Sequence, residues 1–122
     1  MNDLHEIVSN LAMELRRGTL VLCVLSQLEK EQYGYSLVQS LTEKGMVIDQ
    51  STLYPLLRRL EKQGLLDSNW SLDENRPRRY YVLNEKGKRV LNRLIEEWTD
   101  MNSTITKLLE AKNGDEDNER LD

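Results

Sequence analysis

The chain has 122 residues, of which 39% are hydrophobic and 31% charged, enough apolar material for the core of one domain. Its single cysteine excludes a disulfide framework and a Cys-based zinc site. Its single histidine excludes most His-ligand metal sites and acid–base catalysis by two histidines. No apolar stretch approaches the ~20 residues of a membrane span, and no signal peptide is visible. We therefore expect a cytoplasmic protein without membrane, metal or cofactor.

The net charge of −4 is distributed unevenly along the chain. Residues 50–93 carry ten basic and five acidic side chains, a local net charge of +5. Because phosphate contacts need only local positive charge, this segment fits a nucleic-acid contact. A solvated helix face and a hairpin that happen to be rich in arginine would explain the same charges.

The first half of the chain predicts three helices. Apolar residues at i, i+3, i+4, i+7 and i+11 predict one helix with a single apolar stripe. After Gly18, which permits a bend, residues 20–28 are apolar nearly all round and predict a buried helix. Residues 35–44 predict a short helix that follows a Tyr33-Gly34 turn and ends at Gly45. The stripe of the first helix consists of Leu4, Ile7, Val8, Leu11 and Leu15.

Asp49 is a good N-cap for the next predicted helix, which ends at Gly64. Four leucines of this helix fall within about 100° of one another and predict a buried face. The opposite face is polar and basic. The buried face would hold Leu53, Leu56, Leu57 and Leu60, and the polar face Ser51, Pro55, Arg58 and Lys62, flanked by Thr52, Tyr54 and Arg59.

A hairpin and a long helix follow. Leu66, Trp70 and Leu72 share one strand parity, and residues 73–77 form a polar, basic tip. Asn84 would cap a helix of about 85–111. Its apolar residues recur at spacings of four and three, which is typical of a coiled-coil seam. The seam consists of Leu94, Trp98, Met101, Ile105 and Leu108.

This order predicts a mainly α protein with a small β-hairpin, that is, a winged helix-turn-helix followed by a long C-terminal dimerisation helix. The expected divisions are a DNA-binding domain with its N-terminal helix over residues 1–84, a dimerisation helix over 85–112, and a disordered acidic tail over 113–122.

Four stretches between residues 15 and 87 form a recognisable pattern: LRRGTL from Leu15, YGYSL from Tyr33, STLYPLLRRLEKQGL from Ser51, and RRYYVLNEKG from Arg78. In order and spacing they resemble the PadR family of bacterial transcription regulators. The single long C-terminal helix is similar to the short-form branch, which includes multidrug-sensing repressors. Asn84 stands where the family usually has threonine, and Gln50 where proline often begins the recognition helix.

Helix-turn-helix geometry makes the helix after Asp49 the recognition helix, with its N-terminal residues near base edges or phosphates. Arg76 and Arg78 would enter or flank the minor groove. Tyr54 has packing over the helix pair as an alternative role, and Arg79 shares the strand parity of Tyr81 and could serve structure. The predicted DNA-binding residues are Tyr35, Ser36, Ser51, Thr52, Tyr54, Pro55, Arg58, Arg76 and Arg78.

We expect a homodimer built on the long-helix seam and on the first helix. The resemblance implies that the paired Trp98 side chains can sandwich a planar aromatic ligand, whereas plain interface packing is the alternative role. The predicted interface consists of Leu4, Ile7, Val8, Leu11, Leu94, Trp98, Met101, Ile105 and Leu108. The predicted effector site consists of Leu11, Leu15, Leu94, Glu97, Trp98 and Met101.

The sequence thus predicts a DNA-binding transcriptional repressor, not an enzyme. It would bind a pseudo-palindromic operator in double-stranded DNA as a homodimer, and a planar lipophilic effector at the dimer interface would release it. A winged-helix protein-interaction module that does not bind DNA is the alternative. The overall acidity favours that alternative, and the basic segment opposes it.

Overall fold

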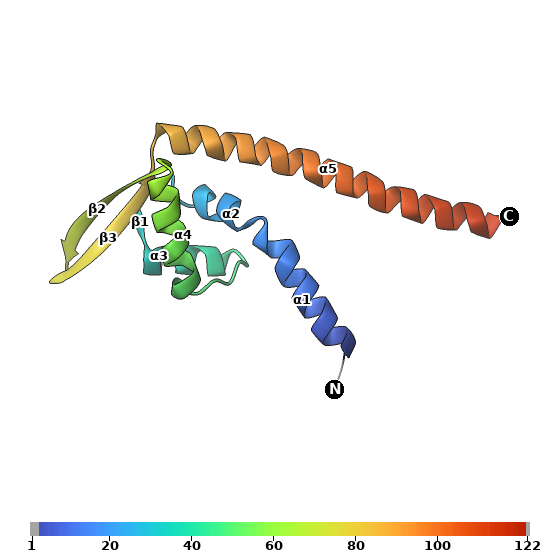
Figure 1. Cartoon of the computed structure of the whole chain (residues 1–122), viewed down its shortest axis with the longest axis horizontal. Coiled ribbons are helices and arrows are strands. Elements are labelled where there is room, and N and C mark those ends of the chain that lie inside the picture. Colours follow the sequence, from blue (N-terminus) through green and yellow to red (C-terminus); the bar gives the residue numbers. More distant parts are fainter. Residues whose placement is uncertain (1–2, 122) are drawn as a thin grey trace. The chain divides into compact units, whose positions relative to one another are not determined.

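The computed structural model describes residues 3–121, without the side chains of Asp73 and of residues 111–121. Figure 1 labels its helices and strands, and the chain divides into two compact units, Met1–Leu91 and Asn92–Asp122. The elements are α1 (Asp3–Arg17), α2 (Leu20–Ser26), β1 (Gln32–Tyr33), α3 (Gly34–Glu43), α4 (Gln50–Lys62), β2 (Leu66–Asp73), β3 (Arg76–Leu83) and α5 (Glu85–Leu121).

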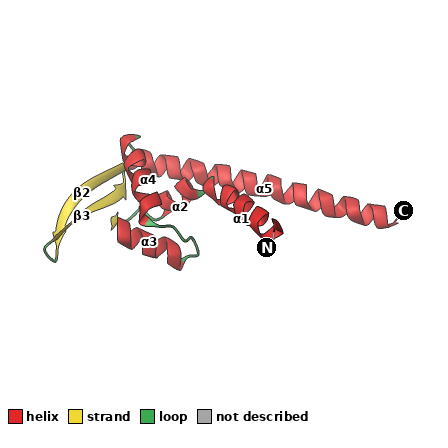
Figure 2. Ribbon diagram, turned by 60° about the horizontal axis from the view of Figure 1, so that its bottom comes forward, coloured by secondary structure: helices red, strands yellow, loops and turns green. Residues whose placement is uncertain are grey.

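The core of the first unit lies between α2, α3, α4 and the base of a small antiparallel sheet. Its side chains are almost all leucines, placed at helical spacing so that each helix contributes one buried face. The fully buried residues are Val24, Leu25, Leu28, Leu37, Leu53, Leu57 and Leu60. This arrangement confirms the predicted winged helix-turn-helix, in which α3 and α4 form the helix pair and the β2–β3 hairpin forms the wing (Figure 2).

The start of α4 is fixed by Asp49, as the sequence predicts. The Asp49 carboxylate accepts a hydrogen bond from the Thr52 backbone N–H at 2.8 Å and another from the Ser51 hydroxyl at 2.7 Å. These bonds stabilise the ionised carboxylate and hold the pKa of Asp49 below its ordinary value. The helix ends before Gly64, whose φ of +84° is accessible to glycine at little cost.

The sheet has three strands in the order β1-β3-β2, one more than the predicted hairpin. The additional strand contains only two residues, which pair as Gln32 with Tyr81 and Tyr33 with Tyr80. So short a strand shows no periodicity in the sequence, and the Tyr33-Gly34 pair by itself predicts only a turn.

The turn of the wing is also shorter than the predicted tip. Asp73 pairs with Arg76, so only Glu74 and Asn75 connect the strands, and both have a positive φ, as in a type I′ hairpin. The wing consequently extends beyond the core. Trp70 and Leu72, which share the parity of buried Leu66, are 67% and 69% exposed because no helix covers that part of the hairpin.

The two terminal helices expose apolar side chains. α1 buries none of its residues, and the polypeptide turns after it at Gly18-Thr19, where the sequence permits a bend.

Asn84 caps α5 by accepting a hydrogen bond from the Gly87 N–H at 2.9 Å. α5 is longer than the predicted 85–112, since it is helical to Leu121. The disordered acidic tail predicted over 113–122 stays a prediction, because it lies where the structure describes no side chains. No described helix is long and apolar enough to cross a membrane.

Candidate nucleic-acid interface

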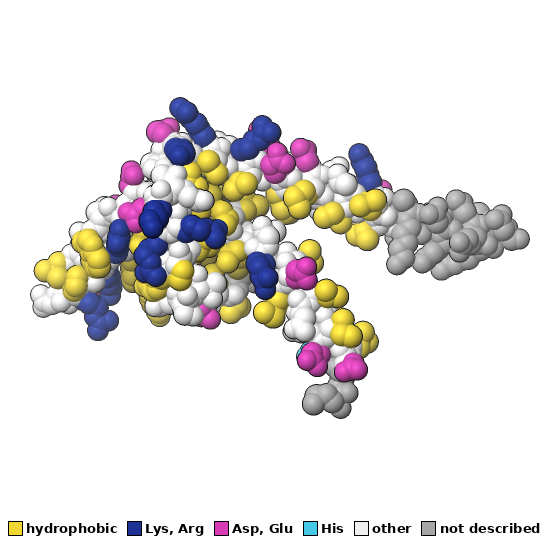
Figure 3. All heavy atoms as spheres, in the orientation of Figure 1, with side chains coloured by type: hydrophobic (Ala, Val, Ile, Leu, Met, Phe, Trp, Pro, Cys, Tyr) yellow, Lys and Arg dark blue, Asp and Glu magenta, His cyan; other side chains and the backbone are white. Residues whose placement is uncertain are grey.

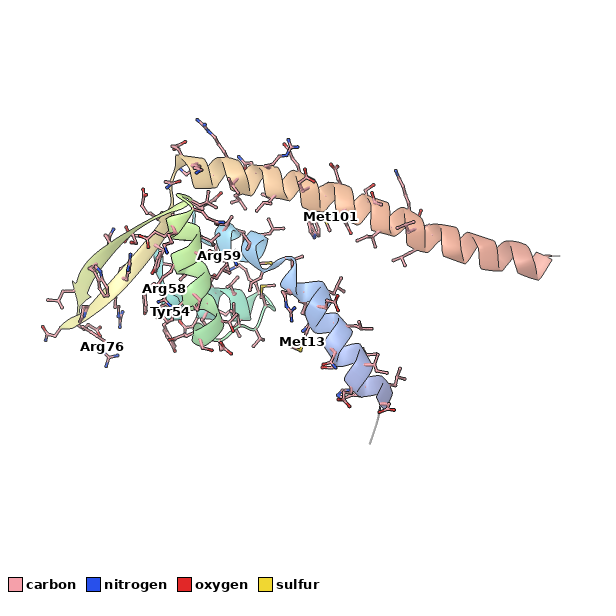
Figure 4. The ribbon with its side chains drawn as sticks, in the orientation of Figure 1. Met13, Tyr54, Arg58, Arg59, Arg76 and Met101 are labelled. Carbon is pink, nitrogen blue, oxygen red and sulfur yellow. The ribbon has the colours of Figure 1, made fainter. Side chains whose placement is uncertain are left out.

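The outer face of α4 collects the polar and basic residues that the sequence assigns to the recognition helix. The helix buries its four leucines, and the 100° advance per residue therefore turns this set toward solvent. Lys and Arg side chains gather over α4 and the wing in the view of Figure 3, and Arg58 and Arg59 project from α4 in Figure 4. The exposed residues of this α4 outer face are Ser51, Thr52, Pro55, Arg58, Arg59 and Lys62.

Tyr54 is half-buried between α4 and α3. A Cβ atom added to Gly34 would overlap the Tyr54 hydroxyl and ring, so the glycine permits this close approach. The contact matches the packing role that the sequence left open for Tyr54. A contact between Tyr54 and DNA stays a prediction.

The start of α3 lies next to the wing. Ser36 closes the first turn, because its hydroxyl donates to the Tyr33 carbonyl at 3.0 Å and accepts from the Tyr33 N–H at 3.1 Å. Tyr33 stacks on the exposed ring of Tyr35 with 6.5 Å between centroids, and it contacts Tyr80 edge-on. The Arg78 guanidinium lies 4.5 Å above the Tyr33 ring. Arg78 is thus placed beside α3 rather than at the tip, where Arg76 remains exposed (Figure 4).

Arg79 joins the wing to α4. Its Nη2 donates to Glu61 Oε1 at 2.8 Å and its Nε donates to the Ser68 hydroxyl at 3.1 Å, while that hydroxyl donates to the second Glu61 oxygen. The guanidinium also lies over the rings of Trp70 and Tyr81, at 5.9 and 5.5 Å from their centroids. The structural role that strand parity suggested for Arg79 is therefore confirmed.

A cleft of about 450 Å³ separates α4 from the wing. Arginines and aromatic rings both line it. Burial raises the pKa of Tyr81, one of these rings, above its ordinary value. The sequence analysis placed Trp70 on a strand of the hairpin but gave it no role at the site, because strand parity alone does not show which elements face a side chain. The wing cleft is lined by Tyr33, Gly34, Tyr54, Arg58, Trp70, Pro77, Arg78, Arg79 and Tyr81.

The described residues contain no group of three His, Cys, Asp or Glu side chains that could hold a metal ion. Cys23 is half-buried, and burial raises the pKa of its thiol, which favours the unreactive protonated form.

The predicted dimer and effector residues lie on α1 and α5. Leu11 and Leu15 belong to the first unit, and Leu94, Glu97, Trp98 and Met101 belong to the second. Leu94 is half-buried, whereas the others are exposed. Glu97 forms an ion pair with Arg93 of the same helix at 3.4 Å, so part of its charge is neutralised. Among the exposed apolar residues are also Leu4, Ile7, Val8, Ile105 and Leu108.

Comparison with known proteins places this geometry among transcription regulators. The family model described as "Transcriptional regulator PadR-like family" matches residues 21–93. A PadR family regulator from Eggerthella lenta has a crystal structure with a TM-score of 0.83 and 50% identity, covering 87% of this chain and 95% of that one. A transcriptional regulator of Mycobacterium tuberculosis is 35% identical over 88 residues, 69% of this chain and 82% of that protein.

One solved relative is bound to DNA. The structure of Bacillus subtilis PadR in complex with operator DNA has a TM-score of 0.59 and 23% identity, and the match covers 63% of this chain and 46% of that one. At this identity the likeness concerns the fold alone.

Proposed function

The chain belongs to the PadR-like family of transcriptional regulators, and from this premise we propose that it binds double-stranded DNA as a homodimer and represses transcription. The family consists of regulators rather than enzymes, so the described residues are to be interpreted as a binding surface. We propose that α4 enters the major groove, that Arg76 reaches the adjacent minor groove, and that the protein acts in the cytoplasm.

The exposed outer face of α4 is the observation that carries this proposal. Ser51 and Thr52 lie at the helix N-terminus, where winged-helix proteins approach base edges, and Arg58 lies two turns further along. Arg76 stands at the end of the wing, about where an adjacent groove would pass. In such an interface, short polar side chains are expected to contact base edges, and cationic side chains are expected to contact phosphates.

A dimer would account for the apolar faces of α1 and α5. Trp98, Met101 and Ile105 are about half exposed, and Leu4 and Leu108 more so. Apolar stripes of this size are typical of an interface, because a monomer would leave them in water. A two-fold dimer presents two copies of α4, and we therefore propose a pseudo-palindromic operator with half-sites spaced by whole helical turns.

The seam of α5 also suggests how binding would be regulated. In a two-fold dimer the two Trp98 indoles approach the axis, where they can stack on each other or hold a planar guest. We propose that a planar lipophilic effector binds there and changes the separation of the two recognition helices, which releases the operator. Interface packing alone is the competing role for Trp98.

The decisive experiment measures DNA affinity as a function of salt. The DNA probe is a duplex selected from random-sequence DNA by its binding to the purified protein. The logarithm of the protein's affinity for this duplex should fall linearly with the logarithm of the salt concentration. Absent or salt-insensitive binding would favour the alternative function, a winged-helix module that binds another protein through its acidic exterior.

A further inference from the structure

The wing cleft holds a large aromatic side chain that the proposed function leaves without a role. Trp70 lies midway along β2 and is 67% exposed, although its ring lines the cleft together with Tyr33 and Tyr54. An indole in water forgoes the free energy that its burial would contribute. Tryptophan is also among the residues enriched where proteins bind their partners.

Arg79 contacts the indole of Trp70 and fixes its position on the wing. The residue pairs with Arg79 across the hairpin, and the Arg79 guanidinium lies 5.9 Å from the indole centroid. Arg79 is itself bound to Glu61 of α4 and to Ser68 of β2. The indole therefore sits on a surface that is ordered before any partner arrives, which lowers the entropy cost of binding.

The chemistry of the cleft selects one kind of partner. Arg58 from α4 and Arg78 from β3 contribute positive charge to its walls, and the rings of Tyr33, Tyr54 and Trp70 contribute apolar surface. The positive charge of Arg79 is already balanced by Glu61. A nucleic-acid strand presents the complementary pattern, with an anionic phosphate at every step and the apolar face of a sugar between phosphates.

We propose that the sugar–phosphate backbone of one operator strand passes through the wing cleft and that a deoxyribose packs on the indole of Trp70. This inference rests on the proposed DNA binding and adds a contact that carries no charge. Trp70 then contributes affinity that salt does not screen, whereas the contribution of Arg58 falls as salt rises. The backbone is thereby held between α4 and the wing.

The test compares substitutions on one face of β2, with a duplex enriched from random DNA as probe. Trp70→Ala should weaken binding about tenfold, because it removes the packing of one large apolar side chain. The slope of affinity against salt should not change, since no charge is removed. Trp70→Phe should retain most of the affinity. Leu72→Ala is the matched control, because Leu72 is equally exposed on the same face but does not line the cleft, and it should change affinity by about twofold at most.

Fluorine NMR of the full chain labelled with fluorotryptophan gives a direct readout. The chain has two tryptophans, and Trp70→Phe identifies their resonances. Addition of the duplex should shift the Trp70 resonance, and thermal melts should show that Trp70→Ala remains folded, because the side chain is exposed.

Any one of three results would overturn this inference and leave the proposed function intact. The first is that Trp70→Ala binds DNA as tightly as Leu72→Ala, and the second is a Trp70 resonance that does not shift when the duplex is added. The third is a salt slope smaller by about one in Trp70→Ala, which would mean that the substitution acts through the charge of Arg79. If the unsubstituted chain showed no salt-dependent binding at all, the proposed function would fail and this inference with it.

Discussion

Arg79 of β3 and Glu61 of α4 form the ion pair that ties the wing to the recognition helix, with 2.8 Å between Nη2 and Oε1. The side chains are 36% and 27% exposed, so water screens the pair only in part. Ser68 bonds to both partners, and the angle between the wing and α4 is thus fixed by three side chains from three elements. Beyond this link the hairpin is little covered, since Trp70 and Leu72 on the same face are 67% and 69% exposed.

Removing the acidic partner should destabilise the fold. We expect Glu61→Ala to lower the free energy of unfolding by about 1 kcal/mol, a value reduced for partial exposure, because Arg79 and Ser68 lose a charged partner. Urea denaturation followed by circular dichroism measures the change. The control is Glu96→Ala, which removes an exposed pair with Arg93 at 3.9 Å and should cost less than ~0.5 kcal/mol. Equal effects of the two substitutions would contradict the role given to Glu61.

The N-cap of α4 should make stability depend on pH. The pKa of Asp49 is lowered in the folded state, so its contribution is fully present above the unfolded-state pKa near 3.8 and is lost as pH falls through the lower folded-state value. Asp49→Asn keeps an acceptor for the Thr52 N–H but does not titrate. Urea midpoints of this variant should therefore fall less steeply below pH 3.8 than those of the unsubstituted chain. Parallel curves would refute the assignment.

The cations of the proposed interface should act through phosphate. The side chains of Arg58 and Arg76 are both exposed. Arg58→Ala and Arg76→Ala should therefore weaken DNA binding and leave the melting temperature of the protein unchanged. Each should reduce the salt slope by ~1 for every phosphate that the arginine no longer neutralises, uniformly across DNA sequences. Arg89→Ala, another exposed arginine, on α5, is the control for a general decrease in positive charge.

Substitution of Thr52 or Tyr54 should act differently. If either side chain reads a base, replacing it should relax the preference at one operator position. If Arg58, Arg76, Thr52 and Tyr54 could all be replaced without change in affinity, the interface would have to lie on another face.

The dimer should be obligate or nearly so. Each large apolar side chain of the α5 seam that the partner buries contributes ~1.5–3 kcal/mol before entropy is subtracted. Ile105→Glu places a charge in the seam and should shift the protein to monomer in sedimentation experiments. Ser103→Glu, outside the seam on the same helix, should leave the dimer intact. A stable, folded monomer of the unsubstituted chain at micromolar concentration would contradict the proposed assembly.

Trp98 should report an effector. Glu97 and Asp100 lie beside it on α5, which favours a cationic over an anionic guest, although Arg93 offsets part of the Glu97 charge. Flat cationic dyes should therefore quench tryptophan emission. Quenching should persist in Trp70→Phe and vanish in Trp98→Ala. Should the dyes fail to quench, or quench Trp98→Ala equally, Trp98 would be interface packing only, and the proposed DNA binding would be unaffected.

Much of the α-helical fold could be predicted from local patterns. The leucines of α4, the Asp49 cap and the Gly64 end are signals read within one or two turns of helix, and the structure confirms each of them. The sheet was harder to predict. A two-residue strand such as β1 exists only because Tyr80 and Tyr81 pair with it, and no local pattern records a partner nearly 50 residues away.

Within the candidate site, the sequence by itself determined which side chains form the exposed polar face of α4, because composition and helical periodicity decide which of them are polar and lie opposite the leucines. The tertiary structure alone decided how the wing contributes. It paired Arg79 with Glu61, placed the Arg78 guanidinium over the Tyr33 ring, and left Trp70 exposed in a cleft although Trp70 shares the strand parity of buried Leu66. The alternation along a strand shows which side chains lie on the same face of the sheet. Whether that face is buried depends on another element covering it, which only the assembled fold decides.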